Sequence, residues 1–232
     1  MSIEKFTGKA EAYASARPSY PEAAVDYITS LATPNAVFTD VGAGTGKFSE
    51  LIAKRGYTLF AVEPNADMQK QLAITLSPYP NAKPVVGTAE QTALSSNSVD
   101  IITCAQALHW IDPAAFWEEC KRIGKPDSIV VALYNISCGG NSTANFNRST
   151  KAFFKNPTVK EFPNPIYFTR EKWLAYMTSH SGAPLPSDPN YAEHMAQVNA
   201  IFDSESVDGL LKRDVVTKVC SEYIKRGKLS VM

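Results

Sequence analysis

The chain has 232 residues, 44% of them hydrophobic and 20% charged, and 23 basic side chains balance 23 acidic ones. These values are typical of a soluble globular protein with one sizeable core, and the lack of a dense Lys/Arg cluster argues against binding to nucleic acid. No stretch approaches the about 20 apolar residues of a membrane span, and the first residues lack the apolar region of a signal peptide. We therefore expect a cytoplasmic protein that does not bind a membrane and is a monomer or a homodimer.

Apolar runs of strand length alternate with amphipathic runs of helix length from residue 22 to residue 134. The pattern predicts strands over 36–41, 58–62, 84–86, 99–104 and 129–134, and helices over 22–31, 47–55, 65–76 and 113–123. Strands joined through helices pair as parallel neighbours. We therefore expect an α/β fold with a Rossmann-like, doubly wound, mostly parallel sheet that helices cover on both faces.

After residue 135 the composition changes to a Ser/Asn/Gly-rich stretch, followed by three prolines within residues 157–165. Such a stretch is typical of an insertion rather than of another strand–helix unit. We expect residues 137–168 to form a substrate lid after the fifth strand, although their aromatic residues would also suit a second structural layer. A helix is expected over 169–179, whereas residues 207–229 fit either a helix or a strand.

The expected organisation is a single domain over residues 1–232. An N-terminal cap segment occupies residues 1–33 and a cofactor-binding core occupies residues 34–136. The lid follows at 137–168, and residues 169–232 complete the fold.

The stretch DVGAGTG at residues 40–46 follows the first strand, where an open parallel sheet binds its ligand. It is not a phosphate-binding P-loop, because Lys47 is followed by Phe48 instead of Ser or Thr. A GxGxxG dinucleotide fingerprint starting at Gly42 would need a glycine where Lys47 stands. Glu63 lies 21 residues after Gly42, at the end of the second strand, where a carboxylate can accept both hydroxyls of a ribose. A ribose without an obligatory pyrophosphate fits S-adenosylmethionine.

Several ordered blocks resemble class I S-adenosylmethionine-dependent methyltransferases, most closely the small-molecule branch often labelled type 11. The blocks are DVGAGTG (40–46), EPN (63–65) with Met68, GTAE (87–90) and SVD (98–100). Two further segments, FTGKAEAYASARPSYP (6–21) and QALHW (106–110), are similar to trans-aconitate methyltransferase-like proteins. The resemblance is good from residue 6 to about residue 135 and weak beyond it.

The resemblance implies S-adenosylmethionine as cofactor, with S-adenosylhomocysteine as its product. The residues that it implies as cofactor contacts are Asp40, Gly42, Ala43, Gly44, Glu63, Pro64, Asn65, Met68, Thr88, Ala89, Glu90, Gln106, Ala107, Tyr13 and Arg17. Glu63 would bind the ribose, and the glycine loop would meet the methionine part. Many relatives have Asp where this chain has Thr88, so adenine recognition would rest on the backbone or on Glu90.

The acceptor is expected beside His109 and Trp110, which follow the fourth strand. His109 is the candidate catalytic residue, because an imidazole can take a proton near neutral pH; alternatively it only shapes the pocket. Substrate contacts are expected from Tyr20, His109, Trp110 and Tyr134. His180 and His194 have no partner pattern and are expected at the surface.

The cysteines Cys104, Cys120, Cys138 and Cys220 are widely spaced and form no CxxC pair. This spacing favours reduced thiols, and no Cys/His/Asp cluster indicates a metal site. We expect no metal.

The expected function is S-adenosylmethionine-dependent methyl transfer by in-line displacement to a small-molecule carboxylate, hydroxyl or amine. One alternative is a nicotinamide-dependent oxidoreductase, against which Lys47 and the lack of a Tyr-x-x-x-Lys pair both argue. Another is a non-catalytic S-adenosylmethionine-binding regulatory protein, because binding and turnover use different residues.

Overall fold

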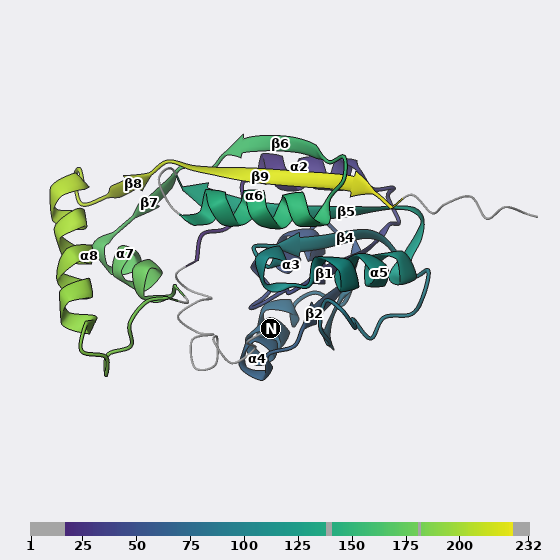
Figure 1. The fold of residues 1–232 in the computed structure, drawn as a ribbon, viewed down its shortest axis with the longest axis horizontal. Coiled ribbons are helices and arrows are strands. Elements are labelled where there is room, and N and C mark those ends of the chain that lie inside the picture. The colour runs from purple at the N-terminus through teal and green to yellow at the C-terminus, as the bar shows by residue number, and fades with distance from the viewer. Residues whose placement is uncertain (1–16, 138–140, 181, 225–232) are drawn as a thin grey trace, which may run out of the picture.

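The computed structural model describes residues 17–137, 141–180 and 182–224. Figure 1 shows a sheet with helices on both faces and a smaller helical unit beyond one end of it. The helices are α2 (Glu22–Ser30), α3 (Lys47–Ala53), α4 (Ala66–Leu76), the 3₁₀ turn η2 (Leu108–Trp110), α5 (Pro113–Ile123), α6 (Asn141–Phe153), α7 (Arg170–Thr178) and α8 (Tyr191–Glu205). The strands are β1 (Val37–Val41), β2 (Thr58–Glu63), β3 (Ala82–Val86), β4 (Val99–Ala105), β5 (Gly124–Ser137), β6 (Thr158–Pro163), β7 (Ile166–Phe168), β8 (Leu211–Arg213) and β9 (Val215–Tyr223).

The main sheet has seven strands in the order β3-β2-β1-β4-β5-β9-β6. The first five strands are parallel, and β9 runs antiparallel between β5 and β6. The expected doubly wound, mostly parallel sheet is therefore confirmed. β9 resolves the ambiguity over 207–229, because from Val215 to Tyr223 the chain is a strand.

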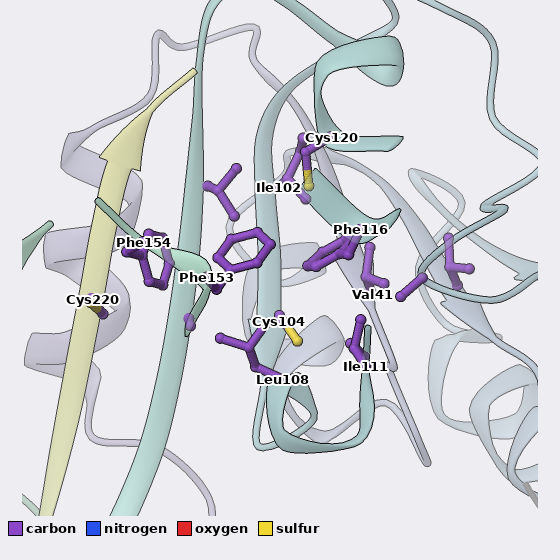
Figure 2. Close-up of a cluster of buried hydrophobic side chains, with 14 of the residues drawn as sticks. Val41, Ile102, Cys104, Leu108, Ile111, Phe116, Cys120, Phe153, Phe154 and Cys220 are labelled. Atoms are coloured by element: carbon purple, nitrogen blue, oxygen red, sulfur yellow. The ribbon is translucent and has the colours of Figure 1, made fainter. Parts of the chain in front are cut away.

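Two hydrophobic cores lie on the two faces of this sheet. Val130 packs in one core and its neighbour Val131 in the other, because successive strand residues point to opposite faces. A strand covered on both sides is therefore apolar throughout, which explains why β5 reads as a continuous apolar run. Figure 2 shows the first core, where Phe116 of α5 and Cys104 of β4 lie among aliphatic side chains.

Residues 137–168 do not form the separate lid that the composition predicts. α6 packs on β5, and its Phe146 and Phe153 are each 5% exposed in the first core. The rings of Phe153 and Phe116 stack with centroids 5.1 Å apart, and Figure 2 shows Phe153 between Phe116 and Phe154. β6 is the edge strand of the main sheet. Four aromatic residues of this segment, Phe146, Phe153, Phe154 and Phe168, are buried, as the alternative of a second structural layer predicts.

The true insertion lies between β6 and β9 and spans residues 164–214. β7 pairs with β8, and α7 packs against α8. This unit has its own core of Phe168, Trp173, Val198, Phe202 and Leu211. The Trp173 Nε1–H donates to the Val198 carbonyl oxygen at 2.9 Å, which joins α7 to α8. In Figure 1 the unit extends beyond the main sheet, at the left.

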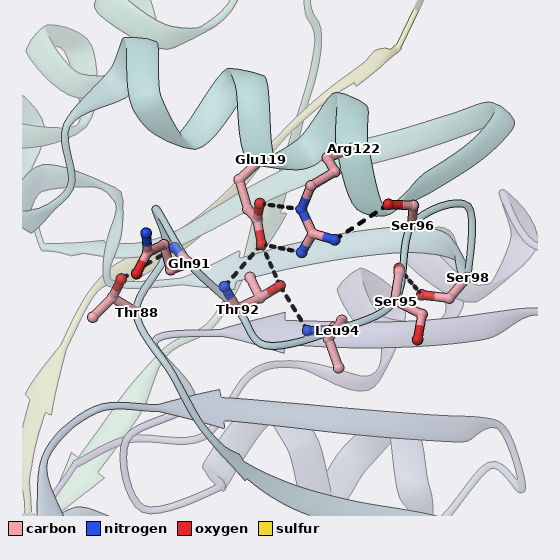
Figure 3. A network of polar contacts seen from close by, with 9 residues as sticks. All are labelled: Thr88, Gln91, Thr92, Leu94, Ser95, Ser96, Ser98, Glu119 and Arg122. Carbon is pink, nitrogen blue, oxygen red and sulfur yellow. Dashed lines mark hydrogen bonds and ion pairs between the residues drawn. The ribbon is translucent and has the colours of Figure 1, made fainter.

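A polar network fixes the loop that follows β3. Glu119 of α5 accepts hydrogen bonds from the Thr92 amide at 2.8 Å and the Thr92 hydroxyl at 2.6 Å. Two guanidinium N–H groups of Arg122 donate to the same carboxylate at 2.7 Å (Figure 3). Because the backbone amide of a loop residue is one of the donors, this network holds the loop itself against α5.

The described cysteines Cys104, Cys120 and Cys220 are buried free thiols, and Cys138 lies outside the described residues. Burial raises the pKa of the Cys104 thiol. Among the described residues, no group of three or more His, Cys, Asp and Glu side chains has the arrangement of a metal site. None of the described helices is both long enough and apolar enough to cross a membrane.

The placement of α6 predicts a large stability cost for Phe153→Ala. The variant removes a 5% exposed ring, and emptying such a site costs about 3–5 kcal/mol of unfolding free energy. Tyr167→Ala is the control, because that ring is 56% exposed and a surface substitution changes stability by about 0.5 kcal/mol or less. Urea denaturation measures both; equal, small losses would contradict the packing of α6 in the core.

Candidate cofactor and acceptor site

The glycine loop after β1 is a tight turn that carries positive φ angles at Gly42 (71°), Gly44 (57°) and Gly46 (89°). A Cβ on Gly42 would lie 2.6 Å from the Cβ of Ala107, so the loop after β4 packs directly on this glycine. The amides of Gly42 and Ala43 both donate to the Val62 carbonyl oxygen, at 2.9 and 3.0 Å. The loop is therefore bound to the end of β2 and presents its backbone to the space above the strands.

Glu63 ends β2 and joins this loop through its side chain. Its Oε2 accepts the Gly44 amide at 2.9 Å, and its Oε1 accepts the Asn65 amide at 2.9 Å. Burial raises the pKa of Glu63, and these two hydrogen bonds oppose the rise. Each carboxylate oxygen has two lone-pair sites, so both oxygens keep one for a further donor.

Asn65 and Met68 form the start of α4. The Asn65 Oδ1 accepts the amides of Asp67 and Met68, both at 3.0 Å, and so caps the helix. Met68 is 3% exposed. The sequence assigned these residues and Pro64 to the cofactor, and the structure adds a local cause for Asn65, which is the helix cap.

Asp40 lies beneath the glycine loop and is fully buried. Its Oδ2 accepts the Ser49 hydroxyl at 2.6 Å, and its Oδ1 lies 3.1 Å from the Thr103 hydroxyl oxygen, which is placed to donate. Burial raises the pKa of Asp40 to about 7, and the two hydroxyl contacts oppose the rise. The carboxyl group thus joins β1, α3 and β4 under the loop.

The residues expected near the adenine follow β3. The amide of Thr88 donates to the Gln91 carbonyl oxygen at 3.0 Å in a turn, and Ala89 packs in the first core. Glu90 accepts the amide of Asp112 at 3.3 Å. Asp112 in turn caps α5, where Pro113 occupies the first turn.

A cavity of about 570 Å³ opens above the glycine loop. Of the residues that the sequence assigned to cofactor or substrate, it is lined by Arg17, Tyr20, Gly42, Ala43, Gly44, Gln106, His109, Trp110 and Tyr134. Tyr13 lies outside the described residues. The cavity therefore brings together most of the predicted acceptor contacts with the loop at the end of β1.

His109 is held by Tyr134 of β5. The Tyr134 Oη accepts the His109 amide at 3.1 Å and lies 3.3 Å from the His109 Nδ1. Burial lowers the pKa of His109 to about 4, and the positive charges of Arg148 and Arg17 lower it further. The imidazole is therefore neutral at neutral pH.

His180 lines the same cavity, and the expectation that it lies at the surface is wrong. It follows α7, and its Nδ1 lies 3.2 Å from the Met177 carbonyl oxygen. A carbonyl oxygen only accepts, so Nδ1 carries the proton and Nε2 has the free lone pair. Burial and the charge of Arg17 lower the pKa of His180 to about 4. The one signal in the sequence is the i, i+4 spacing from Tyr176, whose ring centroid lies 4.7 Å away.

Two cationic side chains line the cavity. They are Arg17 and Lys47. Burial lowers the pKa of Lys47, the first residue of α3. A helix N-terminus also attracts negative charge, so this end of the cavity favours an anionic group.

A parallel sheet of this strand order, with a glycine loop after its first strand and an acid ending its second, defines the fold of class I methyltransferases. Residues 39–132 match the family described as a methyltransferase domain, Methyltransf_11. This match and the strand order together assign the chain to the methyltransferase fold.

Two kinds of relative support this assignment. An uncharacterized methyltransferase of Mycobacterium tuberculosis is 37% identical over 135 residues, which cover 58% of this chain and 53% of the relative. This chain thus spans about half the length of the curated relatives it matches. A candidate type II methyltransferase from Anaeromyxobacter dehalogenans has a similar structure, with a TM-score of 0.69 and 19% identity over 91% of this chain and 99% of its own.

A SAM-dependent methyltransferase from Aquifex aeolicus is also similar, with a TM-score of 0.54 and 17% identity over 66% of this chain and 89% of its own. At such identities both structures show a shared fold. The narrower similarity to trans-aconitate methyltransferase-like proteins stays a prediction.

The burial of Asp40 predicts a pH dependence of stability that Asp40→Asn removes. The pKa rises from 3.8 to about 7 on folding, so the native state holds a proton that the unfolded chain releases. The contribution of Asp40 to the free energy of unfolding is fully present below pH 3.8 and falls as the pH rises towards 7. We expect the stability of the wild type relative to Asp40→Asn to fall by roughly 2–4 kcal/mol from pH 4.5 to pH 8. Urea denaturation at each pH measures both proteins. An equal change in unfolding free energy with pH in the two would contradict the raised pKa of Asp40.

Proposed function

We propose that this protein transfers a methyl group from S-adenosylmethionine to a small-molecule acceptor. The observation that carries the proposal is the hydrogen bond from the Gly44 amide to the Glu63 carboxylate, at 2.9 Å, beside the cavity that His109 lines. This arrangement puts a ribose-binding acid, an exposed glycine backbone and an acceptor space at one edge of the sheet.

The residues present fit this cofactor. A Cβ on Gly44 would meet no atom within 4 Å, so the backbone there is open, whereas Gly42 lets Ala107 pack against the loop. Glu63 retains lone pairs for the two ribose hydroxyls, and Lys47 with the start of α3 suits the carboxylate of the methionine part. Thr88, Ala89 and Glu90 would contact the adenine, and Asn65 and Met68 would flank the adenosine.

The cofactor supplies a methyl group that is already activated on a sulfonium. The protein therefore has to align the acceptor with the methyl carbon and to exclude water. A hydroxyl acceptor loses its proton to the neutral imidazole of His109, whereas a carboxylate acceptor has none to lose.

The charge of the cavity favours some acceptors over others. Arg17 lines the acceptor side together with His109 and His180, and the cationic Lys47 lines the same cavity. An ammonium acceptor would meet positive charge there, so a carboxylate or an acidic hydroxyl is favoured over an amine. Tyr20, Trp110 and Tyr134 supply aromatic walls for a small molecule.

The competing functions make different binding predictions. A nicotinamide-dependent oxidoreductase would be stabilised against heat by NAD(P), and a shift with NAD(P) alone would refute methyl transfer. A non-catalytic binding protein would bind S-adenosylhomocysteine without turnover on a broad panel of carboxylate, hydroxyl and amine acceptors. Thermal shift with both ligands, followed by this panel, distinguishes the three.

Glu63→Ala is expected to raise the Kd for S-adenosylhomocysteine at least tenfold in calorimetry, because charged hydrogen bonds contribute about 1.5–3 kcal/mol each. Glu118→Gln is the control, since the exposed Glu118 pairs with Lys121 on α5. Unchanged affinity in Glu63→Ala, or an equal loss in both variants, would refute the ribose role.

His109 predicts the pH profile of turnover on a hydroxyl acceptor. A base must be neutral, and the pKa of His109 is lowered to about 4, so kcat/KM should stay level from pH 5.5 to 7.5. His109→Gln should lower kcat at least tenfold with a hydroxyl acceptor and by less than about threefold with a carboxylate. An acid limb near pH 6.5 that His109→Gln abolishes would contradict the lowered pKa.

A further inference from the structure

Residues 17–20 line the cavity through Arg17, Pro18 and Tyr20, and two asparagine side chains hold this segment at Ser19. The Ser19 carbonyl oxygen accepts the Nδ2 groups of Asn135 and Asn164, both at 3.1 Å. Asn135 lies near the end of β5, and Asn164 lies between β6 and β7. One carbonyl group thus joins the N-terminal segment to the sheet and to the start of the insertion.

The orientation of these amides is fixed by their other partners. The Asn135 Oδ1 accepts the Thr217 hydroxyl at 2.6 Å and the Asn164 Nδ2 at 3.1 Å, which leaves its own Nδ2 for Ser19. The Asn164 backbone amide donates to the Val215 carbonyl oxygen at 2.8 Å. The chain leaves the sheet at Asn164 and returns to it at Val215, so this cluster sits at both roots of the insertion.

A second contact joins the same segment to the insertion farther out. The Arg17 Nη2 donates to the Ser179 carbonyl oxygen at 3.3 Å, and its guanidinium carbon lies 5.5 Å from the centroid of the Tyr176 ring. Ser179 is 2% exposed at the end of α7. Arg17 and Tyr20 line the cavity from the segment, and Tyr176 and His180 line it from the insertion.

We propose that Asn164 and Asn135 are positioning residues that fasten residues 17–20 to the insertion, so that the two covers of the cavity open together. Release of the cofactor product then requires the Ser19 contacts to break. Binding at the glycine loop also orders α7, which carries part of the acceptor side, so the cofactor and acceptor sites are coupled. The proposal rests on the proposed function in taking S-adenosylhomocysteine as the ligand.

We call the contacts of Asn135 and Asn164 with the Ser19 carbonyl oxygen the clasp. The variant Asn164→Asp tests the clasp because it keeps the shape of the side chain and places an oxygen opposite the Ser19 carbonyl. The matched control is Asn81→Asp, since the Asn81 Nδ2 also donates to two carbonyl oxygens, those of Ala53 at 3.0 Å and Tyr57 at 2.7 Å. Asn81 lies just before β3, at the opposite edge of the sheet. Asn164→Ala repeats the test without a new charge and serves if the aspartate variant does not fold.

Two measurements are made with S-adenosylhomocysteine as the probe. In stopped-flow displacement, both Asn164 variants should release it at least fivefold faster with an association rate within about threefold of wild type, and Asn81→Asp should not. In hydrogen exchange, the ligand should protect residues 170–178 in wild type and in Asn81→Asp but not in the Asn164 variants. Equal release rates in all proteins, or retained protection of 170–178 in the Asn164 variants, would overturn the clasp.

The clasp and the proposed function fail separately. If wild type does not bind S-adenosylhomocysteine, the proposed function falls. Exchange without ligand then decides the clasp, because Asn164→Asp should expose residues 19–25 and 170–178 together relative to Asn81→Asp. Deprotection of only one of the two segments would refute their fastening.

Discussion

The hydrogen bond from the Gly44 amide to the Glu63 carboxylate is the contact on which the site depends. It joins the loop after β1 to the end of β2, and the amides of Gly42 and Ala43 reinforce the same join through the Val62 carbonyl. Such a loop can turn this tightly only where glycine allows positive φ. The loop is therefore a fixed surface, and residues 17–20, the ends of β4 and β5 and the insertion line the cavity beside it.

The buried polar groups beneath and beside that loop serve its rigidity. Asp40 holds α3 and β4 under it, and Glu119 holds the loop after β3 against α5. Buried carboxyl groups are costly without partners, and here each has hydroxyl or amide donors. Ionisable groups near the cavity respond to the same burial, which keeps His109 and His180 neutral.

Local pattern predicted most of the sheet and the position of Glu63, because strand length, apolar runs and loop glycines are written in neighbouring residues. Pro113–Ile123 was predicted to the residue as α5. The lid was misplaced because composition does not distinguish aromatic side chains that pack in a core from those that cover a cavity. His180 and Asn164 were missed because their roles arise from contacts with Arg17 and Ser19, more than 140 residues away.

The antiparallel strand β9 has a consequence for how such a protein diversifies. Since β9 fills the place between β5 and β6, the insertion leaves and rejoins the sheet on neighbouring strands, and the family match at residues 39–132 ends before it begins. The insertion is therefore a unit with its own small core, attached to the sheet only at two neighbouring strands. A change in its length or sequence can be accommodated there without a new order of strands in the sheet.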